Sequence, residues 1–557
     1  MYQSTNLPNT RRNPMNRHSL LKLISAVLLL SMLLAACAPA ATPAPAAPAA
    51  APKATEAPKP AEAPKATEAP KATEAPKPTT APAAAPKAAA PVEVKYSMMF
   101  AAQKDIKVVE EALNAALTKK GVNIAVRLVP FEDAAFTEKM NLMMAAGEAC
   151  DIVWVAPWIA PTFSQLVING SLLPLDDLLQ KNAAALLKDM PPAAWDVTKI
   201  SGKIYAVPNQ QIWVKPFGFW FRKDIADKYG LDPAKIAKYE DLEPFLAAVK
   251  KGEPNMLPIM LRDGTPASIW MVETFGFDPV VTQDVQAVVR YDDKALKVIN
   301  GYETPEFKSA VELARKWNQA GYFNKDLVAR AEAPAAYKAG KFAGGIGGVV
   351  KPGGDSEIQK NNGLTVPVVQ KSVTVPFMTT GAASATSTAI CKSSKNPDAA
   401  MQLLNLFNTD ADLYNLLAKG IEGKHWVWAD KDKKVVGPGP DNANYKPGRD
   451  WMLGSIFNAY YVDADQAAGD MIGATKKLNA SSAASVALGF AFDPTPVKTE
   501  MANVTNVVKE LGYPLINGMA DPATVLPEFQ KKLKDAGMDK IVAEAQKQID
   551  AWKATKK

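Results

Sequence analysis

Residues that could carry out acid–base or nucleophilic chemistry are few in this chain. It contains two histidines, and only His425 lies beyond the N-terminal segment. No Gly-x-Ser-x-Gly turn is present to hold a serine nucleophile. Adjacent acids occur at 176–177 and 292–293, but the two acids of a glycosidase must face each other across a substrate. The sequence therefore predicts no catalytic residues and no histidine-rich metal site, and we interpret His425 as structural.

A glycine-rich run at residues 344–354 is the next candidate for chemistry. It lacks the Gly-Lys-Ser/Thr ending of a phosphate-binding loop. Glycine permits backbone turns that other residues resist. We interpret the run as a turn at the edge of a cleft and expect no nucleotide, metal or other cofactor.

Tryptophans with polar neighbours are the strongest candidates for binding. Sugar rings present apolar C–H faces that stack on indoles, while their hydroxyls need amide or carboxylate partners. Trp317 and Trp552 fit helical runs and Trp220 fits an apolar strand, so we expect these three to be structural. For four other tryptophans, ligand contact and core packing are equal alternatives. The predicted ligand-binding residues are Trp158, Trp213, Gln210, Gln211, Trp270 and Trp451.

The elements that must position these residues alternate between strands and helices. Residues 105–119 carry apolar side chains at spacings of three and four, which is typical of a helix. A β-α-β-α-β order indicates a parallel, doubly wound sheet whose ligands bind at the carboxyl ends of the strands. Trp158 follows the third strand, so it should face that edge. The expected elements are strands 92–99, 123–129 and 151–155 and helices 105–119 and 136–146.

The N-terminus has the features of a secretory signal. Four basic residues precede an apolar stretch, 23–34, that at roughly 12 residues is shorter than the about 20 needed to span a bilayer. The stretch ends in Leu-Ala-Ala-Cys37, which resembles a bacterial lipobox, whose cysteine receives a lipid before cleavage. An ordinary signal peptide with a chance cysteine is the alternative, and translation starts at Met1 or Met15. We expect lipidation of Cys37 and an extracytoplasmic, membrane-anchored protein.

Residues 38–91 consist almost wholly of Ala, Pro, Lys, Thr and Glu, with a six-residue repeat that begins at residue 52. Without aromatic residues this segment cannot form a core, and regular proline favours extended polyproline II. At about 3.1 Å per residue it could reach on the order of 170 Å. We interpret it as a disordered tether between the membrane and a folded region.

The formal net charge of +7 is concentrated before residue 92, because residues 92–557 carry 54 basic and 53 acidic side chains. A nucleic-acid partner needs a concentrated basic face, so we expect none. Besides Cys37 the chain has Cys150 and Cys391, both among apolar strand-like residues. One disulfide and two buried free thiols are the alternatives, and we favour the thiols.

The remaining residues are too many for one core, so we expect two lobes. The segments that cross between them are predicted near 209–216 and 385–389, with a third in the C-terminal region. The predicted organisation is 1–36 signal peptide, 37–91 lipidated cysteine and tether, 92–210 plus about 386–450 lobe one, and 211–385 plus part of 451–557 lobe two and C-terminal region.

Six segments in order resemble those of family 1 extracellular solute-binding proteins. The step from a helix through Gly147 to Asp151-Ile-Val resembles that family, as does the start of the second lobe at Phe219-Trp-Phe-Arg. Cys150 stands where many relatives carry proline, and we expect this difference to be structural. C-terminal segments resemble the lipoprotein branch of the family. The six segments lie at 143–154, 172–178, 202–208, 219–224, 340–348 and 386–398.

The resemblance implies a two-lobe periplasmic-binding-protein-like (type II) α/β fold whose doubly wound sheets are joined by a hinge. It implies a monomer that captures a solute and delivers it to the permease of an ABC transporter. We expect an oligosaccharide or sugar derivative, trapped by hinge closure with Trp158 and Trp213 stacking on its rings. Peptides and polyamines are alternative ligands. A tethered polysaccharide hydrolase and a surface adhesin are alternative functions, and we do not expect an enzyme.

Overall fold

The structure is a computed structural model that describes residues 90–556 except 160, 263–268 and 330–331. All elements described below belong to Pro86–Lys557. The predicted signal peptide, Cys37 and nearly all of the tether lie outside the described residues.

Lobe one is built on a five-stranded sheet with the order β2-β1-β3-β15-β6. β1, β2 and β3 are parallel, as the alternating sequence pattern predicted, whereas β15 runs antiparallel to both β3 and β6. Tyr96 and Met98 in β1 and all of β3 are buried, because both faces of the sheet are covered. The strands are β1 (Val92–Met99), β2 (Ile124–Phe131), β3 (Ile152–Val155), β6 (Val207–Pro208) and β15 (Ser387–Ile390).

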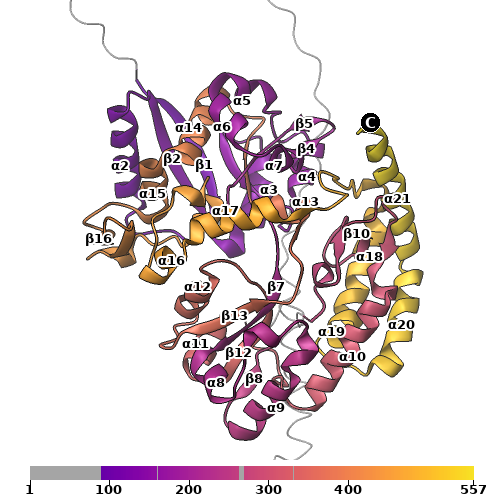
Figure 1. The fold of residues 1–557 in the computed structure, drawn as a ribbon. Coiled ribbons are helices and arrows are strands. Elements are labelled where there is room, and N and C mark those ends of the chain that lie inside the picture. Colours follow the sequence, from indigo (N-terminus) through magenta and orange to yellow (C-terminus); the bar gives the residue numbers. More distant parts are fainter. Residues whose placement is uncertain (1–89, 160, 263–268, 330–331, 557) are drawn as a thin grey trace, which may run out of the picture. The chain divides into compact units, whose positions relative to one another are not determined.

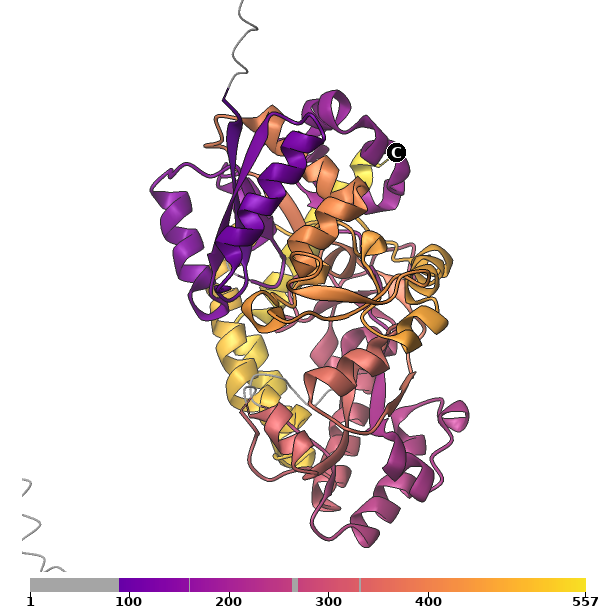
Figure 2. The ribbon, with the colours of Figure 1, turned by 90° about the vertical axis from the view of Figure 1, so that its left-hand side faces the viewer.

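Helices far apart in the sequence cover this sheet together. α2 (Ile106–Lys119) buries Val109, Leu113 and Leu117, which follow one another at spacings of four residues. In Figures 1 and 2 the orange-brown α14 and α15 lie beside the indigo β1 and α2, and the Tyr96 ring stacks on Phe407 of α14 with centroids 6.0 Å apart. The other helices of lobe one are α3 (Phe136–Ala145), α4 (Phe163–Ile168), α5 (Asp176–Asn182), α6 (Ala184–Asp189), α7 (Pro192–Asp196), α14 (Pro397–Thr409) and α15 (Ala411–Lys419).

Lobe two is built on a four-stranded sheet with the order β13-β7-β12-β8. Two glycines let its strands approach closely. A Cβ atom on Gly218 would lie 1.9 Å from the carbonyl oxygen of Lys371, and one on Gly344 would lie 2.2 Å from that of Trp220. Its main elements are β7 (Phe217–Arg222), β8 (Leu257–Ile259), β12 (Phe342–Val349), β13 (Val368–Ser372), α8 (Lys223–Lys228), α9 (Glu243–Gly252), α10 (Pro305–Gln319), α11 (Ala333–Lys338) and α12 (Gly354–Asn361).

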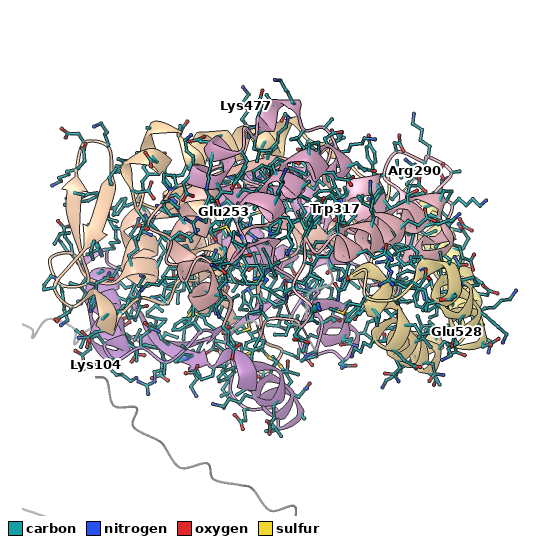
Figure 3. The ribbon with its side chains drawn as sticks, turned by 90° about the horizontal axis from the view of Figure 1, so that it is seen from below. Lys104, Glu253, Arg290, Trp317, Lys477 and Glu528 are labelled. Atoms are coloured by element: carbon teal, nitrogen blue, oxygen red, sulfur yellow. A yellow bond between two sulfur atoms is a disulfide. The ribbon has the colours of Figure 1, made fainter. Side chains whose placement is uncertain are left out.

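The C-terminal helices complete the core of lobe two by packing on α10. Phe529 of α20 contacts Tyr302 and Phe307 with ring centroids 5.1 and 6.1 Å away. Trp317 of α10 is fully buried, as predicted, and Figure 3 shows it among side chains while Lys104, Lys477 and Glu528 lie at the periphery. This layer contains β9 (Phe277–Pro279), β10 (Ala287–Arg290), β11 (Ile299–Asn300), α18 (Lys498–Val507), α19 (Tyr513–Ile516), α20 (Pro522–Asp535) and α21 (Met538–Thr555).

Three segments of the described chain connect the lobes. The first crossing, residues 209–216, joins β6 to β7 at the predicted place. The second crossing occupies 373–386, earlier than the predicted 385–389, because residues 387–390 already form β15 beside β3. The third crossing, residues 482–490, leaves α17 (Met471–Ser481) and pairs with the second through β14 (Phe377–Met378) and β18 (Ala483–Ala484).

Cys150 and Cys391 form a disulfide, so the preference for free thiols was wrong. Ile390 of β15 pairs with Ile152 of β3, and the backbone N–H of Cys391 donates to the carbonyl of Asp151. This pairing brings the Cα atoms of the two cysteines to 5.7 Å, within disulfide range. Two residues that are 241 positions apart could be matched only by the strand pairing.

Candidate ligand-binding site

The carboxyl edge of the parallel strands in lobe one carries an exposed indole. Trp158 lies three residues beyond the end of β3, and 52% of its side chain is exposed. Among the described residues it is the one aromatic side chain that is more than a third exposed. Its Nε1 donates to the carbonyl oxygen of Ala385 at 2.5 Å, which ties the indole to the second crossing.

Trp158 is part of a cluster of three tryptophans, which we call the aromatic edge: Trp154, Trp158 and Trp451. The Trp158 ring centroid lies 5.5 Å from that of Trp154 and 6.3 Å from that of Trp451. Trp154 is fully buried and donates from Nε1 to Thr386 Oγ1 at 2.6 Å. Trp451 is half-buried. The buried ring supports the other two, which leaves indole surface of Trp158 and Trp451 accessible at the strand ends.

Charged groups lie at the same edge. Asp133 comes two residues after the end of β2, and its carboxylate accepts from Arg449 at 2.6 Å. Arg449 precedes Trp451 by two residues, so this ion pair fastens the Trp451 segment to the edge of the sheet. On the other side, Asp450 pairs with Lys419 at 2.7 Å, and its carbonyl accepts from Tyr414. Indole faces beside a carboxylate and a guanidinium provide both kinds of contact that a sugar requires.

Trp213, in the first crossing, does not face the ligand side as we predicted. Trp213 is 4% exposed, and its Nε1 donates to the carbonyl of Asn209 at 3.0 Å, so its ring belongs to the core of lobe one. Gln210 and Gln211 are half-buried. Their backbone groups hold the crossing: Gln210 N–H donates to Gly454, and the Gln211 carbonyl accepts from Asn479 Nδ2. The predicted stacking role of Trp213 is therefore not supported, because neither ring face is free.

Trp270 is also enclosed, but in lobe two. It is 2% exposed, packs against Phe275 and Phe307 at 5.1 and 5.0 Å, and donates to Gln286 Oε1 at 2.7 Å. We predicted it as a ligand contact from its polar neighbours in the sequence. Its environment is a hydrophobic core, and we do not place it in the site.

Sequence reasoning missed Asp133, Arg449 and Trp154. Asp133 comes two residues after the end of the second parallel strand, so the rule that ligands bind at the carboxyl ends of such strands could have found it. Arg449 has no local signal, because its partner lies 316 residues away. We predicted Trp154 as part of a buried strand, which is correct, but its contact with the indoles of Trp158 and Trp451 depends on the tertiary fold.

A groove of about 860 Å³ lies elsewhere, between α10 and α20 of lobe two. Lys308, Arg315 and Leu526 are among the residues that line it. None of the predicted ligand-binding residues lines this groove. Strand ends do not meet there, so we do not assign the ligand to this groove.

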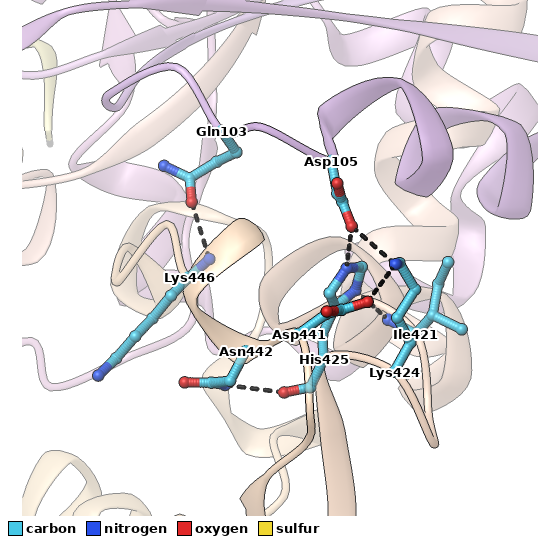
Figure 4. A network of polar contacts seen from close by, with 8 residues as sticks. All are labelled: Gln103, Asp105, Ile421, Lys424, His425, Asp441, Asn442 and Lys446. Atoms are coloured by element: carbon cyan, nitrogen blue, oxygen red, sulfur yellow. Dashed lines mark hydrogen bonds and ion pairs between the residues drawn. The ribbon is translucent and has the colours of Figure 1, made fainter.

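His425 is fully buried in a polar network, as expected for a structural role (Figure 4). Its Nδ1 accepts from the backbone N–H of Ile421 at 3.0 Å, so Nε2 carries the proton and donates to Asp105 at 3.1 Å. Lys424 also contacts this carboxylate, at 3.0 Å. Hydrogen bonds from His425 and Lys424 lower the pKa of Asp105. The network joins the start of α2 to residues 421–442.

Asp105→Asn is expected to lower the melting temperature near neutral pH, because the ion pair with Lys424 is lost. The pKa of Asp105 is lowered in the folded protein, so its stabilising effect is present above the ordinary pKa of about 4 and is lost as pH falls through the lowered value. Melting curves of both proteins from about pH 7 to about pH 3 should therefore converge in acid. A difference in melting temperature that does not change with pH would contradict this prediction.

Comparison with known families supplies the decisive observation. The sequence profile of the bacterial extracellular solute-binding proteins matches residues 101–414, more than half of the chain. The chain belongs to this family. A domain of unknown function matches residues 486–554, which include α18 to α20 and nearly all of α21. As an extracellular solute-binding protein, it works outside the cytoplasm.

Relatives of this solute-binding protein include a carbohydrate ABC transporter substrate-binding protein of Streptococcus pneumoniae serotype 4. The two are 28% identical over 449 residues, 79% of this chain and 86% of the relative. The crystal structure of an N-glycan transport solute-binding protein from Streptococcus pneumoniae is 25% identical, with a TM-score of 0.73 and coverage of 84% of this chain and 100% of that one. These matches establish the two-lobe fold.

The same N-glycan transport protein in complex with Man5GlcNAc gives a TM-score of 0.66, with coverage of 84% and 99% and 25% identity. No helix in the part of the chain that the structure describes is long and apolar enough to cross a bilayer.

Proposed function

We propose that this solute-binding protein captures an oligosaccharide at the aromatic edge and delivers it to the permease of an ABC transporter. The observation that carries the proposal is the exposed indole of Trp158, supported by Trp154 and Trp451 at the carboxyl ends of the parallel strands. Such strand ends are where doubly wound sheets bind ligands, and an indole face is suited to a sugar ring.

The rest of the edge is consistent with a hydroxyl-rich ligand. Asp133 and Arg449 lie at the same edge with side chains that are 56% and 28% exposed, so both can contact hydroxyls from the solvent side. The hydrogen bond from Trp158 Nε1 to the carbonyl oxygen of Ala385 links the site to the second crossing. Ligand bound between the lobes would therefore act directly on a segment that must bend when they close.

Binding to a panel of glycans tests this function. The probes are Man5GlcNAc, alginate oligosaccharides and a basic peptide, each added to the purified full-length protein in thermal-shift and calorimetric assays. A ligand at 100 times its dissociation constant should stabilise the fold by about 2.7 kcal/mol. Glycan binding without turnover supports the proposal. Glycan cleavage would favour the hydrolase alternative, and stabilisation by the peptide alone would exclude an oligosaccharide ligand.

We further propose that Cys37 anchors the protein through a lipid and that residues 38–91 act as a tether. The support is the Leu-Ala-Ala-Cys37 motif directly before a proline-rich repeat. One acyl chain binds a bilayer only weakly, so stable anchoring requires more than one.

Cys37→Ala is expected to release the protein from the membrane fraction into the medium or periplasm. Glycan affinity should not change, because Cys37 precedes the folded region by more than fifty residues. Fractionation with immunoblotting measures the release, and calorimetry measures the affinity. A variant that stays with the membrane would show that Cys37 is not the anchor.

A further inference from the structure

Two adjacent residues at the end of the second crossing accept hydrogen bonds from two indoles of the aromatic edge. The carbonyl oxygen of Ala385 accepts from Trp158 Nε1 at 2.5 Å, and Thr386 Oγ1 accepts from Trp154 Nε1 at 2.6 Å. Trp158 is half exposed, whereas Trp154 is fully buried. Both N–H donors are turned into the protein, so Trp158 presents its ring and not its N–H group to the solvent.

Thr386 is also bonded to the first crossing. Its Oγ1 accepts a second hydrogen bond, from Asn209 Nδ2 at 2.8 Å, and its carbonyl oxygen accepts from the backbone N–H of Asn209 at 3.1 Å. Both residues are 1% exposed. A hydroxyl oxygen has two lone pairs, so Trp154 and Asn209 use the whole accepting capacity of Oγ1. A side chain without this oxygen would leave two buried donors unpaired, which is unfavourable in a protein interior.

The ring of Trp154 supports the other two indoles of the aromatic edge. Its centroid lies 5.5 Å from that of Trp158 and 6.1 Å from that of Trp451, with interplanar angles of 61° and 78°. Phe136 also packs against it, at 5.5 Å. Aromatic contacts tolerate some rotation of a ring, whereas a hydrogen bond fixes the direction of its N–H group. The bond to Thr386 therefore determines how the supporting ring is oriented.

We propose that Thr386 is a positioning residue for the ligand site: its hydroxyl oxygen fixes Trp154 and, through that ring, the ring faces of Trp158 and Trp451. This inference rests on the proposed function and adds to it a buried residue that sets affinity without touching the ligand. Stacking on an indole depends on how the ring is placed, and a binding site holds its geometry only if the residues behind it are fixed. A displaced Trp154 therefore weakens glycan binding even though all three indoles are retained.

Thr386→Val keeps the shape of the side chain and removes the accepting oxygen. In calorimetry it should bind Man5GlcNAc roughly threefold to tenfold more weakly than the wild type. Thr386→Ser keeps the oxygen and should bind as the wild type does. In the Trp158→Ala background, Thr386→Val should cost less affinity than in the wild type, because one of the two rings through which Thr386 acts is gone. Trp154→Phe removes the same hydrogen bond from the donor side and should also weaken binding, so the test does not depend on the folding of one variant.

Thr388→Val is the matched control. Thr388 is 1% exposed and donates from Oγ1 to Asn209 Oδ1 at 3.0 Å, so it belongs to the same buried network but bonds to neither indole. Its replacement should lower the urea midpoint of unfolding about as much as Thr386→Val does, while affinity for Man5GlcNAc stays within about twofold. Unchanged affinity in Thr386→Val, or an equal loss of affinity in both variants, would overturn the inference.

A measurement without ligand separates the positioning role from the proposed function. Isotope-labelled tryptophan gives one indole N–H signal per ring in NMR spectra of the full-length Cys37→Ala protein, and Trp158→Phe and Trp451→Phe assign the two signals of interest. Thr386→Val should shift both signals, whereas Thr388→Val should leave the Trp451 signal in place. A Trp451 signal that does not shift in Thr386→Val contradicts the positioning role. If the wild type binds no glycan, the proposed function fails while the indole signals still decide whether Thr386 positions the rings.

Discussion

Trp158→Ala is expected to weaken glycan binding by about 5- to 150-fold while changing the stability of the fold little. Loss of a stacking indole removes on the order of 1 to 3 kcal/mol of binding free energy. Because half of the side chain is already exposed, its removal opens no cavity, and we expect a stability loss of about 1 kcal/mol. Calorimetry measures the affinity and urea unfolding measures the stability.

Trp213→Ala is the matched control for this prediction. Its indole is 4% exposed in the core of lobe one, so its removal should destabilise the fold by about 3 to 5 kcal/mol. Trp451→Ala should resemble Trp158→Ala in affinity, because the two rings lie side by side. If Trp158→Ala keeps its affinity but loses several kcal/mol of stability, the aromatic edge is structural and the site lies elsewhere.

Replacing both Cys150 and Cys391 with alanine is expected to lower the free energy of unfolding by about 2 to 5 kcal/mol. The bond closes a loop of 241 positions, so it strongly restricts the unfolded chain. It also joins β15, which directly follows the second crossing, to β3, which leads to Trp158. Urea unfolding of the double variant and of the wild type under oxidising conditions measures the difference.

Reduced wild type should unfold at nearly the same urea concentration as the double variant, because both lack the bond. Glycan affinity at 25 °C should stay within about twofold, since neither cysteine lies at the aromatic edge. Equal unfolding midpoints for the oxidised wild type and the double variant would show that the bond contributes no stability.

The sequence predicted the parallel half of lobe one almost residue by residue. Strand 92–99 agrees with β1, and the helix expected at 105–119 agrees with α2 (Ile106–Lys119). These elements are specified locally, because alternation of apolar side chains and spacings of three and four depend only on neighbouring residues. The position of Trp158 could be predicted in the same way, because it comes three residues after a strand whose carboxyl end should face the ligand.

The burial of the other predicted tryptophans could not be assigned in this way. Trp213 follows Gln210 and Gln211 in the sequence, and Trp270 follows Ser268, yet both indoles are enclosed in cores. Whether an indole is buried depends on which distant segments cover it, such as Phe275 and Phe307 around Trp270. The polarity of the neighbouring residues in the sequence does not indicate which distant segments will bury an indole.

The sequence by itself determined the family, the parallel strands of the first half and the position of one exposed indole, because short-range patterns encode them. Only the tertiary structure decided that Cys150 meets Cys391, that Trp451 lies beside Trp158 and that Asp463 faces Lys360. These partners are separated by more than a hundred residues of chain. Such pairs form because strand pairing and helix packing bring distant segments together, and no local pattern specifies which partners will meet.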